Sequence, residues 1–457
     1  MNINEVVQQA KDADVQLVRF IYCDNSGVIR GKATHVDHLS GRMDHGIGLT
    51  VAMQSFTSSE SIAPGAGFGP VGEIRLVPDP GTFTILPYSP GNARMIADMF
   101  TLDRKPWDNC PRYFLKRMIE RAATLGLRIK AAFESEFSLA VETDDGYEPF
   151  DRSLCFSTIG MDYADEYIGE VVQALGQQGI RVEQYYAELG AGQQELSVTY
   201  DDALRAADNQ ITLRDTARGV ALKQGLIASF APKPFADQAG NGCHIHFSAW
   251  DGNGDGDGDG DGERNLFFDA SDRYKLSQTA YRFIAGVLHH LPGLVALTAP
   301  SMNSYQRLQP HFWSSAFTCF GPDNREAPVR IASGFWGDEM RTVNLELKPS
   351  DSSHNPYIAL GGLIAAGLDG IEGEMQPPEP VLVDPGDMDE SEREKRNIKR
   401  LPTNLKEAAD ALARDEVLIE AMGEVLAREY LLIKSADWED SKEKDPESVL
   451  RQYFHRY

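Results

Sequence analysis

The segment of residues 128–142 reads RIKAAFESEFSLAVE, and apolar and polar side chains alternate through its centre. Alternation with a period of two predicts a β-strand with one buried face and one polar face. Glu134 and Glu136 are two residues apart, so both carboxylates point to the same face. Adjacent carboxylates on an inward face are destabilising unless a cation lies between them. The segment therefore predicts a strand with both carboxylates on one face, an arrangement that is compatible with a cation site.

Other segments offer metal-ligating side chains in similar patterns. The further candidates are Glu188, Glu195, His244, His246 and Glu346. The two glutamates Glu188 and Glu195 flank a glycine-containing turn, the histidines share one face of the strand-like segment 243–250, and Glu346 is central in the strand-like segment 343–349. Carboxylates with one or two imidazoles suit Mg²⁺ or Mn²⁺ better than zinc. Each pair alone is more often a solvated strand face or a hydrogen-bonded pair, and only the ordered set favours a site.

N-terminal to the segment 128–142, the first hundred residues predict a small β-domain, which we place at 1–104. The stretches VQLVRFIYCD (15–24) and VIRGKATHV (28–36) flank the turn signal DNSG, which is typical of a β-hairpin. A second β-rich stretch, EIRLVPDPGTFTILPY, spans residues 73–88.

Residues 105–457 predict a larger α+β domain, in which helices pack behind the apolar face of the sheet. We expect strands at 128–142, 243–250 and 343–349, and helices at 113–125, 162–179, 201–224, 272–290 and 403–457.

Composition restricts the possible partners. The formal charge of −25 disfavours nucleic acid and anionic membranes. The most apolar stretches, 283–300 and 357–371, are interrupted by histidines, proline or glycines, so we expect buried helices there. Five scattered cysteines and an N-terminus without an apolar signal segment favour a cytoplasmic protein.

The acidity and the run DGNGDGDGDGDGE (251–263) favour a salt-tolerant host. The run looks like the start of an EF-hand calcium loop, but the twelfth position counted from Asp251 or Asp255 is Gly262 or Leu266 where that loop needs glutamate. A flexible solvated loop between two strands is the favoured interpretation.

A resemblance to a known family rests on the order of the motifs. From about residue 15 to the end, the chain resembles glutamine synthetase in the segments ESEF, ELGAGQQE, GNGCHIHFS, NSYQRL, DNREAPVRI and LELKP followed by NPYIAL. The resemblance implies a glutamine synthetase fold with an N-terminal β-grasp domain and a curved antiparallel catalytic sheet. It also implies active sites between subunits of a homo-oligomeric ring, commonly a dodecamer, and an ATP-dependent ligase that phosphorylates the γ-carboxylate of glutamate.

The resemblance also implies roles for residues, motif by motif. One of two metal ions would be held by Glu136, Glu188 and Glu195, and the other by Glu134, His244 and Glu346. The residues that match ATP contacts are Glu183, His246, Ser248, Arg330 and Arg341. The residues that match glutamate contacts are Gly240, Arg307, Arg325 and Lys348, with Arg307 and Arg325 as the catalytic arginines. Two divalent cations and several arginines suit a reaction that gathers negative oxygens.

The chain departs from the family pattern where ammonia would be handled. The family's Asp-Gly-Ser-Ser loop corresponds to SFTSSE (55–60), which lacks aspartate, and Trp313 replaces the glutamate of its flap. An aromatic side chain suits an alkylammonium group, as in the γ-glutamylpolyamine synthetases. Ala239 also replaces an asparagine, and Lys348 an arginine, at positions that contact glutamate.

Three interpretations follow from these departures. The first is a ligase that joins glutamate to a small organic amine such as putrescine. The second is an ordinary ammonia-dependent glutamine synthetase, in which Glu60 or another nearby carboxylate replaces the missing aspartate. The third is a non-catalytic, ring-forming homologue, which the retained set of metal-ligating side chains disfavours.

Overall fold

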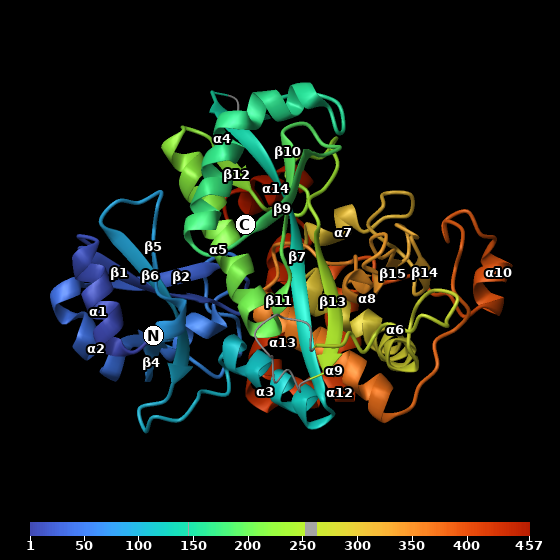
Figure 1. Cartoon of the computed structure of the whole chain (residues 1–457), viewed down its shortest axis with the longest axis horizontal. Helices are drawn as coiled ribbons and strands as arrows, with labels where there is room; N and C mark the ends of the chain where they lie inside the picture. The colour runs from blue at the N-terminus through green and yellow to red at the C-terminus, as the bar shows by residue number, and fades with distance from the viewer. Residues whose placement is uncertain (145, 252–262) are drawn as a thin grey trace.

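A computed structural model describes residues 1–144, 146–251 and 263–457 (Figure 1). The predicted solvated loop falls on residues 252–262, outside the described residues.

The N-terminal part is a small mixed sheet with helices on it. Its elements are α1 (Ile3–Asp12), β1 (Leu17–Cys23), β2 (Ile29–His35), α2 (Leu39–His45), β3 (Ile47–Thr50), β4 (Glu73–Pro78), β5 (Thr84–Ile85) and β6 (Asn92–Phe100). The strand order is β2-β1-β6-β4-β3, with β5 also paired to β6. The predicted hairpin is confirmed, since β1 and β2 are antiparallel, whereas β1 and β6 are parallel.

The larger part contains a second sheet. Its strands are β7 (Leu127–Thr143), β8 (Gly146–Pro149), β9 (Val182–Ala187), β10 (Gln193–Val198), β11 (Asp201–Asp202), β12 (Ile227–Ser229), β13 (Cys243–Asp251), β14 (Phe320–Pro322), β15 (Val329–Ala332) and β16 (Asn344–Leu347). The main path is β14-β15-β16-β13-β7-β10-β9, and β8, β11 and β12 also pair with β7. The sheet is antiparallel except between β14 and β15. In Figure 1, β7 and β13 run side by side through the middle of the molecule.

Helices cover one face of this sheet and extend the domain. They are α3 (Pro111–Thr124), α4 (Thr158–Gln177), α5 (Ala203–Lys223), α6 (Gln278–Thr298), α7 (Ser304–Arg307), α8 (Glu339–Thr342), α9 (Pro356–Glu372), α10 (Glu390–Lys395), α11 (Leu405–Ala413), α12 (Glu416–Met422), α13 (Glu424–Ser441) and α14 (Pro446–Phe454). The predicted boundary at 104/105 lies in the connection between β6 and α3.

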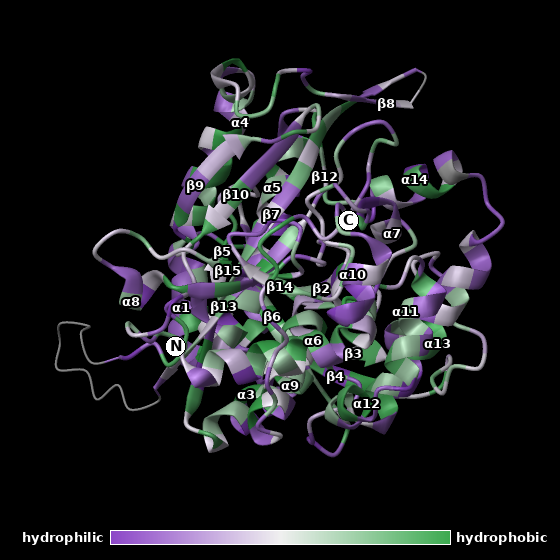
Figure 2. Ribbon diagram, turned by 90° about the vertical axis from the view of Figure 1, so that its right-hand side faces the viewer, coloured by the Kyte–Doolittle hydropathy of each residue, from purple (hydrophilic) through white to green (hydrophobic). Residues whose placement is uncertain are grey.

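The core explains which face of the sheet remains polar. Odd-numbered residues such as Phe133, Ile245 and Leu347 are buried against α6 and α9, and Figure 2 shows apolar residues concentrated on these helices. Even-numbered residues on the same strands therefore point away from the helices.

Helix α6 differs from the sequence-based prediction of 272–290. Residues 272–277 form turns, and Ser277 caps a helix that begins at Gln278 and continues through Pro292 to Thr298. Gly286 packs against the backbone of Gly370 on α9 so closely that a Cβ there would lie 2.6 Å from the Gly370 nitrogen. Tight helix packing of this kind holds the helix together across the proline.

The predicted buried helices at the two most apolar stretches are confirmed. Among the described residues, α6 alone has the length and composition to cross a membrane, and 78% of its most apolar window is buried within the protein. A buried core helix meets the same criteria. Helix α9 is buried over nearly its whole length.

The hairpin tip between β1 and β2 ties the two parts together. Asn355, the N-cap of α9, donates its side-chain amide to the carbonyls of Cys23 and Asp24 at 3.1 and 3.0 Å. Gly27 has a φ of +82°, and a Cβ there would lie 2.1 Å from the carbonyl oxygen of Ser353. Only glycine fits this position.

Candidate active site

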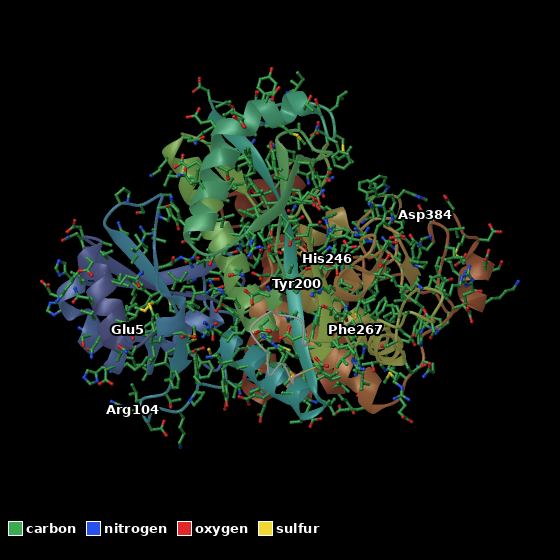
Figure 3. All side chains as sticks on the ribbon, in the orientation of Figure 1. Glu5, Arg104, Tyr200, His246, Phe267 and Asp384 are labelled. Atoms are coloured by element: carbon green, nitrogen blue, oxygen red, sulfur yellow. The ribbon has the colours of Figure 1, made fainter. Side chains whose placement is uncertain are left out.

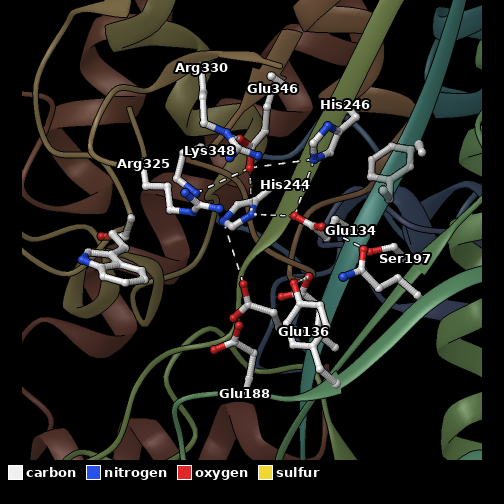
Figure 4. A pocket seen from close by; sticks show the side chains of 18 of the residues that line it. Glu134, Glu136, Glu188, Ser197, His244, His246, Arg325, Arg330, Glu346 and Lys348 are labelled. Carbon is white, nitrogen blue, oxygen red and sulfur yellow. Dashed lines mark hydrogen bonds and ion pairs between the residues drawn. The ribbon is translucent and has the colours of Figure 1, made fainter. Parts of the chain in front are cut away.

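Strand register brings four predicted ligand residues together. His244 lies opposite Glu134, and His246 lies opposite Glu346. His244 Nδ1 is 3.3 Å from a Glu134 oxygen and 3.2 Å from a Glu346 oxygen. In Figure 4 these side chains point toward one another.

His246 also belongs to this cluster. Ligand atoms of Glu134, His246 and Glu346 lie within 4.8 Å of one another. The Nε2 atom of His246 is buried without a hydrogen-bond partner among the described residues. It is 3.5 Å from Glu134 and 3.8 Å from Glu346, beyond normal hydrogen-bond length. An orphaned imidazole nitrogen that faces two carboxylates fits a cation between them.

A second carboxylate group adjoins the first. Glu195 lies opposite Glu136 on neighbouring strands, and the Tyr186 hydroxyl donates to Glu195. Burial, together with the charges of Glu134 and Glu136, raises the pKa of Glu195 well above its usual range. Burial and the charge of Glu136 also raise the pKa of Glu188. Burial and mutual repulsion both disfavour the charged carboxylates, and a divalent cation would offset both effects.

Cationic side chains offset the charge of Glu346. Arg330 forms an ion pair with it, and Lys348 Nζ is 3.5 Å from it. Burial alone would raise the pKa of Glu346, but Lys348, His244 and His246 outweigh burial and hold it well below its usual range. Burial opposes a charged His246, yet Glu134 and Glu346 raise its pKa to about 9. His246, Arg330 and Lys348 therefore supply part of the positive charge that a metal ion would bring to the site.

Arg307 approaches the site from α7. It is 4% exposed, and its Nη2 is 3.1 Å from His244 Nε2 and 3.3 Å from the carbonyl of Lys348. Its Nη1 is buried without a hydrogen-bond partner in the described part of the chain. A free guanidinium edge in a buried site suits a carboxylate or phosphate ligand. Gly242 leaves room for this edge, since a Cβ there would lie 2.7 Å from Arg307 Nη2.

One cavity of about 930 Å³ joins all the predicted site residues. The predicted metal ligands Glu134, Glu136, Glu188, Glu195, His244 and Glu346 line it. So do the predicted ATP contacts Glu183, His246, Ser248, Arg330 and Arg341, and the predicted glutamate contacts Gly240, Arg307, Arg325 and Lys348. Figure 3 places His246 and Tyr200, another lining residue, at the centre of the molecule beside β7.

Trp313 lies in a strained turn that also lines this cavity. Its φ is +55°, and its neighbours His311 and Ser315 have φ values of +65° and +71°. Trp313 is 64% exposed and Phe312 is 56% exposed. The ammonium of Lys233 lies 5.5 Å from the centre of the Phe312 ring. Trp313, the residue predicted for the amine site, therefore lies at the cavity beside Phe312.

The loop 55–60 does not line the cavity of its own chain within the described residues. Glu60 pairs with Arg30 at 2.7 Å, which lowers the pKa of Glu60. Ser58 bonds to Asp437 of α13 at 2.8 Å. Within one chain, Glu60 therefore binds Arg30 and lies outside the cavity.

Sequence reasoning missed several residues of the site. It did not single out Tyr186, Gln193 or Lys233, and the family resemblance placed His246 with the ATP contacts although its strand position had made it a candidate metal ligand. Gln193 donates to Glu136 at 2.8 Å and to the carbonyl of Gly240 at 3.0 Å, and its place in ELGAGQQE was the available signal. His311, which also lines the cavity, lies 2.9 Å from Asp384.

Buried carboxylates, imidazoles and arginines around one cavity define an enzyme that brings anionic substrates together with divalent cations. The profile of glutamine synthetase catalytic domains matches residues 108–453, and that of glutamine synthetase N-terminal domains matches residues 1–107. The chain belongs to the glutamine synthetase family of ATP-dependent ligases. Members use divalent metal ions and ATP, with glutamate and ammonia or an amine, and are typically oligomers.

The individual relatives include both a gamma-glutamylpolyamine synthetase and glutamine synthetases. The chain is 35% identical to the gamma-glutamylpolyamine synthetase GlnA3 of Streptomyces coelicolor, over 95% of this chain and 92% of that protein. It is also 35% identical to the glutamine synthetase of Thermus thermophilus, over 99% of each chain. Among solved structures, a novel glutamine synthase homolog has a TM-score of 0.86 and 31% identity, and covers 97% of this chain and 99% of its own. The GmaS/ADP complex has a TM-score of 0.84 and 30% identity, and covers 97% of each chain.

Proposed function

We propose that the protein joins the γ-carboxylate of glutamate to a small organic amine, such as putrescine, at the expense of ATP. The observation that carries this proposal is the position of Trp313 at the cavity, where the family's ammonia-using members have a carboxylate. The name of the Streptomyces coelicolor relative, a gamma-glutamylpolyamine synthetase, supports the same choice.

The first step is phosphoryl transfer to glutamate. An oxygen of the γ-carboxylate attacks the γ-phosphorus of ATP, the bond to the β-phosphate oxygen breaks, and ADP leaves. Divalent cations, Mg²⁺ or Mn²⁺ and two per site, would neutralise the phosphate oxygens when bound. The buried edge of Arg307 offers a bidentate contact for the α-carboxylate. Arg325 and Arg330 line the phosphate side and stabilise developing negative charge there.

The second step is transfer of the acyl group to nitrogen. The amine nitrogen attacks the acyl carbon of γ-glutamyl phosphate, the carbon–oxygen bond to phosphate breaks, and the nitrogen loses a proton. Trp313 and Phe312 give an alkylammonium chain apolar and cation–π contacts. Once an amine is bound beneath them, they would also shield the acyl phosphate from water, which would otherwise hydrolyse it.

An ammonia-dependent glutamine synthetase is the second candidate, and the name of the Thermus thermophilus relative favours it. The experiment that separates the two measures phosphate release with ATP and glutamate against ammonium, putrescine, spermidine, ethanolamine and short alkylamines. We expect an organic amine to have the highest kcat/KM. Preference for ammonium would refute the proposal, and lack of any metal- and amine-dependent ATP hydrolysis would favour a non-catalytic homologue.

Trp313→Glu tests the acceptor site directly. We expect kcat/KM for the preferred organic amine to fall about tenfold, since a cation–π contact contributes about 0.5–2 kcal/mol. Trp336→Glu is the matched control, because Trp336 is fully exposed and is not among the residues that line the cavity. Equal amine kinetics for Trp313→Glu and wild type would place Trp313 outside the acceptor site.

We also propose a homo-oligomeric ring, a cytoplasmic location and a salt-tolerant host, as predicted from the sequence. No contact with nucleic acid or membrane is proposed.

A further inference from the structure

A buried carboxylate lies behind the turn that carries Trp313. Glu326 is 6% exposed, and one of its oxygens accepts a hydrogen bond from the backbone nitrogen of Trp313 at 2.6 Å. We propose that Glu326 is a positioning residue that holds Trp313 over the acceptor side of the cavity and couples it to Arg325. This inference rests on the proposed function for the role of Trp313.

The backbone around Trp313 needs such a support. Left-handed conformations at non-glycine residues cost about 1–3 kcal/mol each and persist only where surrounding contacts hold them. His311, Trp313 and Ser315 all adopt them, and no described strand or helix covers residues 308–319. A carboxylate that accepts from a backbone nitrogen forms a strong, charge-assisted hydrogen bond. Glu326 therefore fixes the position of Trp313, the residue proposed to contact the amine.

Hydrogen bonds made by the segment 324–326 also fix the backbone of Glu326. Its backbone nitrogen donates to the side-chain oxygen of Asn324 at 3.0 Å. The Asn324 amide donates in turn to the carbonyls of Val381 and Val383, at 2.9 and 3.0 Å. Arg325 lies between these two anchored residues. The turn that presents Arg325 to the cavity is thus the turn that holds Trp313.

A second contact closes this network on the flap. Asp384, next to Val383, lies 2.9 Å from His311, two residues before Trp313. The turn at 311–315 is therefore attached at two points, the Trp313 backbone and the His311 ring, to the network of contacts that includes the turn of Arg325. The same set of contacts therefore fixes both the turn of Trp313 and the turn that carries Arg325.

A different role for Glu326 would be proton acceptor for the amine. The geometry disfavours it, because one oxygen is already bonded to a backbone nitrogen and Glu326 is not among the described residues that line the cavity. A positioning residue needs only an acceptor oxygen, which glutamine keeps, whereas a base needs the carboxylate.

The test compares Glu326→Gln and Glu326→Leu with wild type and with Glu390→Leu, an exposed control on α10. Phosphate release and amide formation are measured together, with the acceptor that wild type uses best. We expect Glu326→Leu to raise the KM for the amine about thirtyfold and to release phosphate without forming amide, since water reaches the acyl phosphate. The KM for ATP should stay within about twofold. Glu326→Gln should raise the amine KM only about threefold.

Two results would overturn the inference. Loss of activity in Glu326→Gln as large as in Glu326→Leu would show that the carboxylate itself is required. Wild-type kinetics and coupling in Glu326→Leu would show that Trp313 is held by other contacts. The comparison of amine acceptors tests the proposed function separately. The ratio of phosphate to amide reports on the position of Trp313 even if ammonium is the acceptor.

Discussion

Glu195→Gln should stabilise the metal-free protein and weaken the further stabilisation that metal binding gives. Glu195 lies directly opposite Glu136 on the adjacent strand, and it is 3% exposed. Side chains in such a pair begin about 5 Å apart. At that distance two full charges repel by about 3 kcal/mol for an effective dielectric constant of about 20.

The substitution removes this repulsion and keeps the hydrogen bond from Tyr186, because the glutamine oxygen still accepts. Since the raised pKa of Glu195 already reduces its charge, we expect a gain of about 1–3 kcal/mol without metal. The unfolding entropy of a chain of 457 residues is about 1 kcal/mol per kelvin. Tm in chelator should therefore rise by about 1–3 °C.

Metal should narrow this difference in stability. At an ion concentration of about 100 Kd, wild type gains about 2.7 kcal/mol, or about 3 °C. A site weakened tenfold gains about 1.4 kcal/mol at the same concentration. The assay is thermal unfolding at fixed protein concentration, in EDTA and in a series of Mg²⁺ or Mn²⁺ concentrations. Glu390→Gln is the control.

The reasoning fails if Glu195→Gln is less stable than wild type in EDTA and shows the same rise in Tm with metal. That result would mean that Glu195 neither repels Glu136 nor binds the ion.

Two further predictions concern other parts of the chain. Arg307→Lys should raise the KM for glutamate about ten- to a hundredfold and leave the KM for ATP within about twofold, because lysine lacks the planar fork; equal changes in both constants would argue against a carboxylate contact. For His290, burial opposes the charged form, but Asp415 and Asp369 outweigh it and raise the pKa above its ordinary 6.5. The stability that its charged form contributes is therefore fully present below pH 6.5 and is lost as pH rises through the higher folded pKa. Urea midpoints measured from pH 6 to 9 should fall less steeply in His290→Gln, and identical slopes would contradict the prediction.

The sequence predicted the polar face of the catalytic sheet because strands obey a simple period. The spacing of two between Glu134 and Glu136, and between His244 and His246, places each pair on one face whatever the tertiary structure. The register between strands could not be predicted in this way. Glu346 lies about a hundred residues from His246 in the chain, and only their pairing on β16 and β13 reveals that His246 faces the cation cluster.

Contacts that depend on loops were also beyond the sequence. The bond between Glu326 and Trp313 joins two irregular segments, and nothing in the local pattern around DNREAPVRI indicates it. The end of α6 was missed because proline usually ends a helix, whereas packing against α9 outweighs that preference here. Intrinsic preferences are weak compared with tertiary packing.

The hairpin tip at Gly27 has a consequence for how the chain can be divided. The side-chain oxygen of Asn355 caps α9 by accepting from the backbone nitrogens of Tyr357 and Ile358, while its NH2 group donates to the carbonyls of Cys23 and Asp24. In a fragment that starts at residue 108, the N-terminus of α9 would be exposed to solvent, and the side-chain NH2 group of Asn355 would have lost its acceptors. The two family segments are therefore one indivisible unit for expression, and an affinity tag or fusion partner belongs at the chain ends, not between them.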